Sequence, residues 1–307
     1  MIFYEVVMIN NIATNQFIYP KSPQLSVVIA TLGGETLLGT IKHLNQGTIV
    51  PAEILLCIPD EESFRVSNLL IDNVVIIKTP CRGQVAQRAV GFQHASHEFV
   101  LQLDDDLVVD SHCVEHLFNA LIAQGRSVAV APALVLASSG LSVYREPGRP
   151  TLVRVYYWLV NGMRGHEPGS ITRAGTSIGI DPSLLNQATV EVEWLAGGCV
   201  IHYRSNLVLN NFFPFSGKAY CEDLFHSYHL RQKGLKLLVC TTARCSIDDK
   251  PSSTLSIPDF LRYLLTEQMI RSQFVRLTAG SMSRMYAHYV VILMLYIRTI
   301  VRQFFHI

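Results

Sequence analysis

Three consecutive carboxylates, Asp104, Asp105 and Asp106, directly follow the apolar segment 98–103. Alternate side chains of a strand share a face, so Asp104 and Asp106 are expected to point the same way. Two such oxygen donors suit a hard divalent cation, Mg²⁺ or Mn²⁺, which takes phosphate oxygens and water as its other ligands. The alternative is a solvated acidic run that caps a helix expected from about Ser111. A position at the end of a strand favours the metal site.

The segments around the acidic cluster alternate between short apolar runs and helical patterns. Strands that are apolar throughout and alternate with helices predict an α/β fold, Rossmann-like, with a mostly parallel sheet and helices on both faces. Such a sheet has its site at the carboxyl ends of its strands. A long irregular stretch is expected from Ser138 to about Pro182. We expect strands at about 25–30, 54–58, 74–77, 98–103, 128–132, 194–202 and 235–241, and helices at about 37–44, 84–95, 111–124 and 222–233.

The composition narrows the functional classes. Of 307 residues, 49% are hydrophobic and only 16% are charged, and the net charge is +1. Nothing global therefore indicates nucleic-acid binding, and some apolar surface is expected to meet something other than water. The seven cysteines form no C-x-x-C pair, which favours reduced thiols in a cytoplasm over disulfides or structural zinc. The N-terminal stretch lacks a basic residue before Lys21 and does not have the pattern of a signal peptide.

Five segments occur in an order and spacing typical of one enzyme family. They are the strand Leu25–Thr31, the helix Arg82–Gly91, the hydrophobic-L-D-D-D element Phe99–Asp110, the segment Trp194–Cys199 and the E-D…R…G helix Tyr220–Gly234. Together they resemble glycosyltransferase family 2, the inverting enzymes of the GT-A fold, over roughly residues 24–245. The resemblance implies a nucleotide-sugar donor and a D-x-D metal site, and it leaves open a bacterial surface-polysaccharide type.

The resemblance also assigns roles to individual residues. It places the metal at Asp104 and Asp106, and it places the acceptor or a phosphate near Trp194, Gly197, Gly198 and Arg231. It places the donor near Ala30, Thr31, Leu32, Asp60, Gly83, Arg88, Asp104 and Asp105. Two departures concern the donor: many members carry an Asp pair where this chain has Ile58-Pro59-Asp60, and Ala89 stands where Asn is usual.

Two neighbouring carboxylates are candidates for the general base that inversion requires. Asp223 matches the family's E-D motif, and Glu222 is its rival. On a helix their side chains point about 100° apart, so only one is expected to face the acceptor. The alternative role for both is favourable charge in the first turn of a helix.

Several further polar residues have two interpretations. Arg231 and Arg88 are either anion clamps or charges without a catalytic role. Trp194 either stacks on a sugar or packs in the core. His202, His226 and His229 are more often structural than metal ligands. The basic stretch from Arg145 to Arg173 is either a lid over a diphosphate or an exposed loop.

The C-terminal region divides from the rest at a Pro- and Ser-rich linker. We expect an N-terminal extension at 1–23, the catalytic domain at 24–249, and a linker with apolar helices at 250–307. Arg284, His288, Arg298 and Arg302 fall within an arc of about 80° on an otherwise apolar helix. Such a stripe suits an anionic membrane surface, contacted through 284–305, and predicts a peripheral location on the cytoplasmic face of the cell membrane. The alternative is a helix docked on the domain or forming a dimer.

The sequence as a whole predicts an inverting, metal-dependent, hexosyltransferase-type enzyme that uses a nucleotide-sugar and a saccharide or lipid-linked acceptor. One rival is a nucleotidyltransferase, although Gly33-Gly34 has no nearby Lys or Arg to form a basic phosphate loop. The other rival is a non-catalytic sugar- or lipid-binding protein of the same fold.

Overall fold

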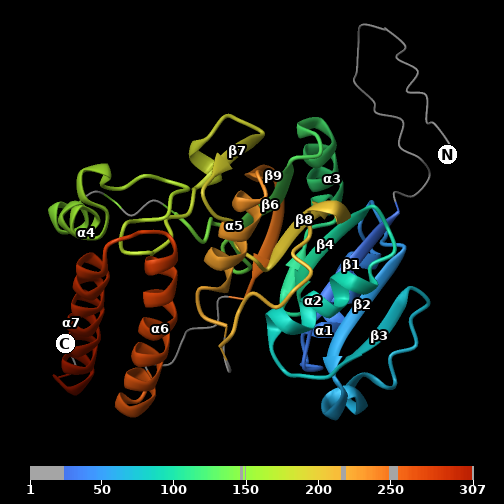
Figure 1. Ribbon diagram of the computed structural model, residues 1–307, viewed down its shortest axis with the longest axis horizontal. Helices are drawn as coiled ribbons and strands as arrows, with labels where there is room; N and C mark the ends of the chain where they lie inside the picture. The colour runs from blue at the N-terminus through green and yellow to red at the C-terminus, as the bar shows by residue number, and fades with distance from the viewer. Residues whose placement is uncertain (1–23, 146–147, 149, 216–218, 249–254, 306–307) are drawn as a thin grey trace, which may run out of the picture.

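The computed structural model describes residues 24–145, 148, 150–215, 219–248 and 255–305 (Figure 1). The expected extension at 1–23, residue 149 of the basic stretch and most of the linker at 250–258 lie outside these ranges.

One nine-stranded sheet forms the centre of the molecule, with the order β3-β2-β1-β4-β8-β6-β9-β5 and with β7 paired to β9. β1 to β4 are parallel neighbours, and β6 and β9 run in the same direction, whereas β5, β7 and β8 run against it. The predicted fold class is confirmed, as a mixed sheet in which most strands share a direction. The strands are β1 (Leu25–Ala30), β2 (Glu53–Pro59), β3 (Val74–Thr79), β4 (Phe99–Asp104), β5 (Leu107–Val109), β6 (Val128–Leu136), β7 (Thr189–Val192), β8 (Cys199–Tyr203) and β9 (Lys236–Ile247).

Helices cover both faces of this sheet because its strands are apolar on both sides. In β1, Val27 and Ile29 belong to one buried cluster with α1 and α3, and Val28 belongs to another with α2. This division follows from the alternation of side chains along a strand. The helices are α1 (Leu37–Asn45), α2 (Gln84–His94), α3 (Cys113–Gln124), α4 (Thr151–Asn161), α5 (Glu222–Gln232), α6 (Ile257–Leu277) and α7 (Met282–Phe305).

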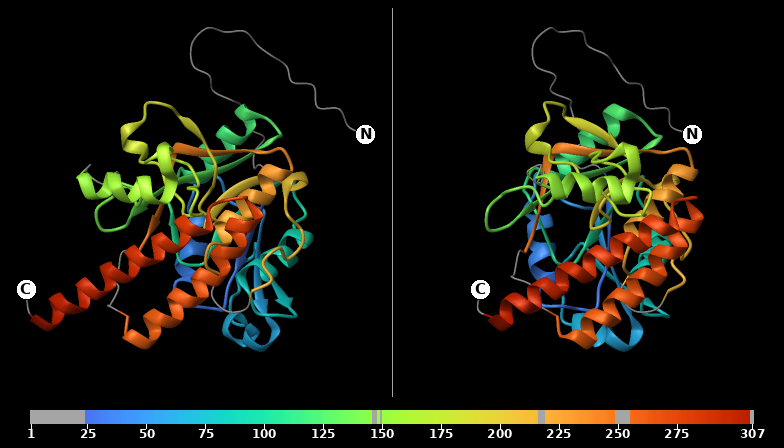
Figure 2. Two further views of the ribbon diagram at one scale, coloured as in Figure 1. Left: turned by 60° about the vertical axis from the view of Figure 1, so that its left-hand side comes forward. Right: turned by 90° about the vertical axis from the view of Figure 1, so that its left-hand side faces the viewer.

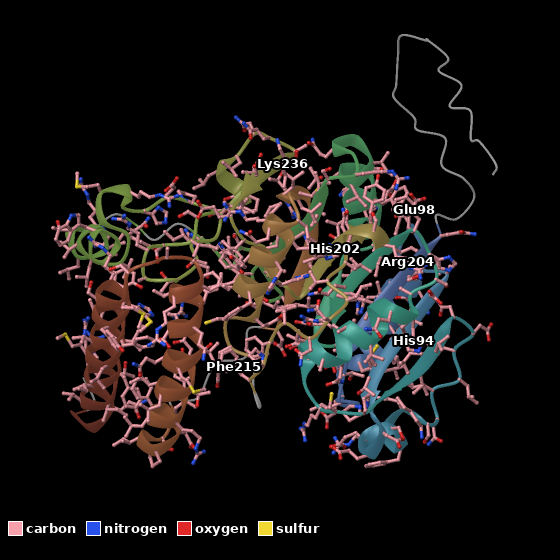
Figure 3. The ribbon with its side chains drawn as sticks, in the orientation of Figure 1. His94, Glu98, His202, Arg204, Phe215 and Lys236 are labelled. Atoms are coloured by element: carbon pink, nitrogen blue, oxygen red, sulfur yellow. The ribbon has the colours of Figure 1, made fainter. Side chains whose placement is uncertain are left out.

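The chain leaves β1 for β2 and β3 on one side and places β4 on the other side. The boundary between β1 and β4 is therefore the point where strand order reverses, and a crevice forms there at the carboxyl ends of the strands. In Figure 3, Phe215 is labelled on the side of the sheet where these carboxyl ends lie. Glu98 and Lys236, which stand at the beginnings of β4 and β9, lie at the opposite edge in the same view.

Two sequence-based expectations about elements are wrong. The stretch 138–182 is not irregular throughout, because it contains α4. Leu152 and Trp158 of this helix are exposed, so its apolar residues do not form the buried stripe by which a core helix is recognised in a sequence. The strand expected at 194–202 begins only at Cys199 and continues to Tyr203. Residues 194–198 form a non-repetitive segment between β7 and β8 that reaches the carboxyl end of β4 at its last residues.

α6 and α7 form a hairpin that packs beside α4 on the part of the chain that contains the sheet (Figure 1). Ile270 and Phe274 of α6 are fully buried in one apolar cluster with Trp194 and Phe225. α7 extends away from this contact, and its C-terminal end projects beyond the rest of the chain in both views of Figure 2. By length and composition, residues Met282–Gln303 form one candidate membrane span, of which 17% is buried.

Half of the predicted basic stripe on α7 faces protein. The Arg284 guanidinium donates hydrogen bonds to the carbonyl oxygens of Trp158 and Leu159 at the end of α4, at 2.8 and 2.6 Å. His288 is buried, and its Nδ1 lies 2.9 Å from the Tyr156 hydroxyl. Only Arg298 and Arg302 are exposed, so the stripe as predicted is wrong in its N-terminal half. The partner of that half is α4, which the sequence did not predict.

Candidate active site

The acidic cluster lies where β4 ends. Asp104 is the last residue of β4, and Asp105 and Asp106 form the turn that leads to β5. Asp104 and Asp106 therefore do not belong to one strand, and strand alternation does not place them on one face. Asp105 accepts a hydrogen bond from the Thr31 hydroxyl, and burial raises the pKa of the Asp105 carboxyl. Asp105 and Asp106 line a hollow of about 420 Å³ at the end of β1.

This hollow contains most of the predicted donor residues. Ala30, Thr31, Leu32 and Gly83 line it, and Arg82, Gln84, Gln87 and Thr36 line it too, which the sequence did not single out. A second hollow of about 250 Å³ adjoins it and shares Arg82, Gly83 and Gln84. Phe213 and Phe215 form an apolar wall of this second space. The two spaces together provide room for an extended polar ligand.

The N-terminus of α2 faces the hollow because of Gly83 and Gln87. Gly83 has a φ of 149°, which side chains of L-residues rarely permit, and no side chain caps the helix that follows it. The buried Gln87 amide donates to the carbonyl oxygens of Thr31 and Cys57, at 2.9 and 2.7 Å, and accepts from the Gly83 N–H. Gln87 thus ties the ends of β1 and β2 to α2. A polar residue on the buried face of a helix was the signal that could have identified it.

Arg88 joins three elements from a buried position. Its guanidinium bonds to Asp104 at the end of β4 and, at 2.6 Å, to Glu222 at the start of α5. Gln84 also donates to Asp104 Oδ1, at 2.9 Å. Arg88 was predicted to contact the donor, but its charge is already paired with two carboxylates. It therefore holds those carboxylates in place and is not a free anion clamp.

Glu222 and Asp223 both approach the same glycine. A Cβ added at Gly197 would collide with Asp223 Oδ1 and would lie 3.0 Å from Glu222 Oε1. The expected angular separation on α5 therefore does not keep one carboxylate away. Burial raises the pKa of Asp223 well above its usual range, and the negative charge of Glu222 raises it further, while Arg88 opposes the shift. A carboxylate with a raised pKa is a stronger base.

Gly197 and Gly198, which directly precede β8, lie against these carboxylates and against Asp104. The Gly197 carbonyl accepts a hydrogen bond from Gln102, and the Gly198 carbonyl accepts one from the Asp104 N–H at 2.8 Å. A Cβ at Gly198 would lie 3.1 Å from Asp104 Oδ2. Glycines are required here because the backbone passes directly between the carboxylates of β4 and α5.

Three other predicted residues lie away from this centre. Trp194 is buried, donates its indole N–H to the Ile178 carbonyl at 2.9 Å, and contacts the Tyr144 ring edge-on. Asp60 stands at the end of β2 but pairs with Lys78 at 2.7 Å and does not line either hollow. Arg231 is exposed in the last turn of α5, about 12 Å along the helix axis from Asp223. Trp194 occupies a core position, so the geometry does not favour a sugar-stacking role for it.

Comparison with known proteins relates part of the chain to one enzyme family. Residues 26–167 match the model of Glycosyl transferase family 2. This segment of the chain is similar to glycosyltransferase family 2. No curated protein matches the chain significantly in sequence.

One solved structure shares the fold of this chain. A crystal structure of GalNAc-T7 with UDP, GalNAc and Mn²⁺ superposes with a TM-score of 0.54 at 19% identity, over 75% of this chain and 44% of that one. TarS from S. aureus, in complex with UDP-GlcNAc, gives a TM-score of 0.44 at 15% identity, over 80% of this chain and 66% of that one. The chain thus spans less than two thirds of the length of either protein.

The donor set of the domain is compatible with a divalent metal that also binds a phosphate ligand. Within the described residues, no three His, Cys, Asp or Glu side chains are grouped as a closed metal site. Asp106 is exposed and lines the hollow. Arg88 and Gln84 both donate to Oδ1 of Asp104, which leaves Oδ2 as the second oxygen of that carboxylate. Mg²⁺ or Mn²⁺ commonly binds through one or two carboxylates, with water and phosphate oxygens completing its shell. The two residues fit such a site.

The three histidines that the sequence singled out, His202, His226 and His229, lie behind this site. His202 of β8 is fully buried, near the middle of the molecule in Figure 3, and its ring lies 5.6 Å from that of His226. His226 stacks on Phe212, and His229 also contacts Phe212. Their neighbours are mostly aromatic rings, which fits a structural role.

Proposed function

We propose that this protein is an inverting, metal-dependent glycosyltransferase of the hexosyl type, which moves a sugar from a nucleotide-sugar to a hydroxyl acceptor. One observation carries the proposal. Asp104, at the end of β4, and the carboxylates of Glu222 and Asp223 meet at Gly197-Gly198, and the next two residues, Asp105 and Asp106, line the hollow at the strand-order reversal. A metal site for a leaving diphosphate and a base for an attacking hydroxyl are thereby adjacent.

The residues have separate tasks in this proposal. Asp104 and Asp106 would hold Mg²⁺ or Mn²⁺, which would screen the diphosphate and stabilise it as a leaving group. The start of α2, whose N–H groups no side chain caps, and Arg82, which lies 3.8 Å from Glu62, line the hollow and favour an anionic donor. The GalNAc-T7 structure contains UDP, GalNAc and Mn²⁺, so UDP-sugars with Mn²⁺ are the first donors to test.

Asp223 acts as the general base. It takes the proton of the acceptor hydroxyl while the acceptor oxygen forms a bond to the anomeric carbon of the sugar. The bond from that carbon to the diphosphate oxygen breaks, and its electron pair leaves with the nucleoside diphosphate. One displacement inverts the carbon and requires no covalent enzyme intermediate. Glu222, which is held by Arg88, keeps the pKa of Asp223 high.

The Asp223→Asn variant tests the proposal. We expect transfer to fall by about 10²–10⁴-fold, because the amide cannot accept the proton. Binding of UDP-sugar with Mn²⁺, measured as a thermal shift, should persist. Glu191→Gln, at an exposed carboxylate paired with Lys236, is the control.

Three results would contradict this assignment. Undiminished sugar transfer by Asp223→Asn would show that Asp223 is not the general base. If only Glu222→Gln lost transfer activity, Glu222 would be the base instead. Release of pyrophosphate with a nucleotidylated product would support a nucleotidyltransferase. Donor binding without turnover by the wild type, across saccharide and lipid-linked acceptors, would support a binding protein.

The C-terminal hairpin supports a membrane location for this activity, with a lipid-linked or polysaccharide acceptor. Val290, Met294, Ile297 and Val301 of α7 are each about half exposed, and Arg298 and Arg302 stand among them. Apolar side chains that alternate with arginines suit the interface of an anionic cytoplasmic leaflet. We infer that the enzyme is peripheral on the inner face of the cell membrane and contacts it through this part of 284–305.

A further inference from the structure

The residue that immediately precedes Glu222 and Asp223 has an unusual backbone conformation. Cys221, at the N-cap of α5, has φ 60° and ψ 12°, in the left-handed region. Within the described residues, only Cys221 and Ala279 are non-glycine residues with positive φ. Such conformations are unfavourable for residues with a Cβ and persist only where surrounding contacts hold them. The direction in which α5 begins, and hence the position of its first carboxylates, depends on this residue.

A buried carboxylate on α6 contacts Cys221. The Cys221 thiol donates a hydrogen bond to Glu267 Oε1 at 3.2 Å. Glu267 also accepts from the Arg271 guanidinium and from the Tyr289 hydroxyl of α7. Burial disfavours ionisation of Glu267, but the charge of Arg271 and these hydrogen bonds outweigh it and lower its pKa. Burial raises the pKa of the Cys221 thiol to about 12, so the thiol keeps the proton that it donates.

The surrounding contacts make this link stiff. Arg271 also donates to the Gly175 carbonyl, which fixes α6 to the loop after α4. The rings of Phe225 on α5 and Phe274 on α6 lie 5.2 Å apart at 69° in an edge-to-face contact. A charged acceptor held by several partners in a water-poor site does not adjust easily to a displacement of its donor.

We propose that Glu267 is a positioning residue for the catalytic carboxylates: it holds Cys221 in the left-handed conformation and thereby keeps Glu222 and Asp223 against Gly197. This inference rests on the proposed role of Asp223. It makes the C-terminal hairpin a structural part of the active site, because both of its helices supply groups to the Glu267 cluster, defined as Cys221, Glu267, Arg271 and Tyr289.

Substitutions at Cys221 separate this role from general stabilisation. Cys221→Ala removes the thiol donor and keeps the Cβ, so kcat should fall about tenfold or more, as misplaced catalytic groups do. Cys221→Gly also removes the donor, but glycine adopts positive φ without help, so its kcat should stay within about threefold of wild type. Cys221→Ser retains a donor and should behave as wild type. The KM for the UDP-sugar should be unchanged in all three, because the donor hollow is not lined by Cys221.

A double substitution provides the decisive comparison. Glu267→Gln should lower kcat about tenfold or more, and adding Cys221→Gly should restore most of that loss. Equal kcat for Cys221→Ala and wild type, or no recovery in the double variant, would overturn the proposal. Circular dichroism and the fraction of folded protein are measured for each variant, so that kcat is expressed per folded molecule.

The outcome is distinguishable from failure of the proposed function. If Asp223→Asn transfers sugar as well as wild type, the base assignment fails, whatever happens at position 221. The contact itself is then tested without turnover by a thermal double-mutant cycle between 221 and 267. Cys221→Gly should reduce the Tm loss caused by Glu267→Gln, and strictly additive Tm changes would overturn the link.

Discussion

At the scale of single residues, the candidate site is an arrangement of buried charges that compensate one another. Arg88 lies between Asp104 and Glu222, and Glu222 in turn approaches Asp223. Removal of the positive charge would leave carboxylates buried without a partner, which is costly in a medium of low dielectric constant. Stability and catalytic geometry are therefore linked through one guanidinium.

Arg88→Met tests this link. We expect the free energy of unfolding to fall by about 3–5 kcal/mol, because the buried Glu222 carboxylate loses its counter-charge. Urea denaturation measures the change. Arg126→Met, at an exposed arginine that pairs with Glu98, is the control and should cost less than about 1 kcal/mol. Adding Glu222→Gln to Arg88→Met should recover part of the loss, and equal losses for Arg88→Met and Arg126→Met would contradict the account.

Two buried histidines predict a pH dependence of stability. Burial, assisted by the charge of Lys233, lowers the pKa of His202 to about 3, and burial with the neighbouring charges of His202, Arg88, His229 and Lys233 lowers the pKa of His226. An unfolded chain has histidines with pKa values near 6.5 and binds more protons than the folded chain below that pH. Stability is therefore retained above about pH 6.5 and decreases toward pH 3, by up to about 1.4 kcal/mol per pH unit for each site.

The measurement is urea denaturation between pH 7.5 and 4.5. His202→Phe should flatten the slope relative to wild type, whatever its stability at neutral pH. His94→Gln removes an exposed histidine at the end of α2 and should leave the slope unchanged (Figure 3). Parallel slopes for wild type and His202→Phe would show that His202 does not contribute.

At the scale of elements, the close approach of α2 to the sheet sets the geometry of the donor hollow. A Cβ at Gly91 would lie 2.5 Å from both Cys57 Sγ and Val28 Cγ1, so α2 lies as close to β1 and β2 as a glycine allows. The Gly83 turn and Gln87 place the other end of α2 at the hollow. A shift of the helix away from the sheet would displace both ends.

Gly91→Ala should therefore destabilise the protein by about 1–3 kcal/mol and weaken UDP-sugar binding. Gly39→Ala on α1 is a matched control, because a Cβ there meets nothing within 4 Å. In that helix Ala is favoured over Gly, and we expect a gain of up to about 1 kcal/mol. Thermal and urea denaturation measure both. The account fails if the two substitutions change stability in the same direction.

The elements that the sequence predicted correctly are those with local signals. β1, β2, α2 and β4 follow apolar runs and helical periods that can be recognised without knowing any partner. α4 was missed because its supporting contacts come from Arg284 and His288 on α7, more than a hundred residues later. The apolar residues of the segment 194–198 predict a strand. In the structure, the backbone of this segment at Gly197-Gly198 instead passes between the carboxylates of β4 and α5.

At the scale of the whole molecule, the hairpin of α6 and α7 has two different sides. Its inner side supplies Glu267 and Phe274 to the region of the candidate site, and its outer side exposes apolar residues and two arginines. Contact of α7 with a membrane would therefore occur on the helix that also carries Tyr289, a donor to Glu267.

Flotation with lipid vesicles tests the outer side. The full-length protein should bind vesicles that contain anionic lipid more strongly than neutral ones, and salt should weaken binding. Met294→Glu with Ile297→Glu should abolish binding, because both side chains are more than half exposed and would bring charge to the interface. Leu70→Glu, at a residue that is 93% exposed in a distant loop, is the control. Protein that stays soluble in low salt without binding vesicles would reject the proposed membrane contact.

The sequence by itself determined the fold class and the position of the acidic cluster at the end of a strand, because apolar periodicity and the residues at strand ends are local properties. It also pointed to Glu222-Asp223 through the family resemblance. Only the tertiary structure decided that Arg88 pairs with carboxylates, that both acids of α5 meet at Gly197, and that Trp194, Arg284 and His288 face protein. These outcomes depend on contacts between segments far apart in the chain, and the charge or period of one segment does not specify its distant partner.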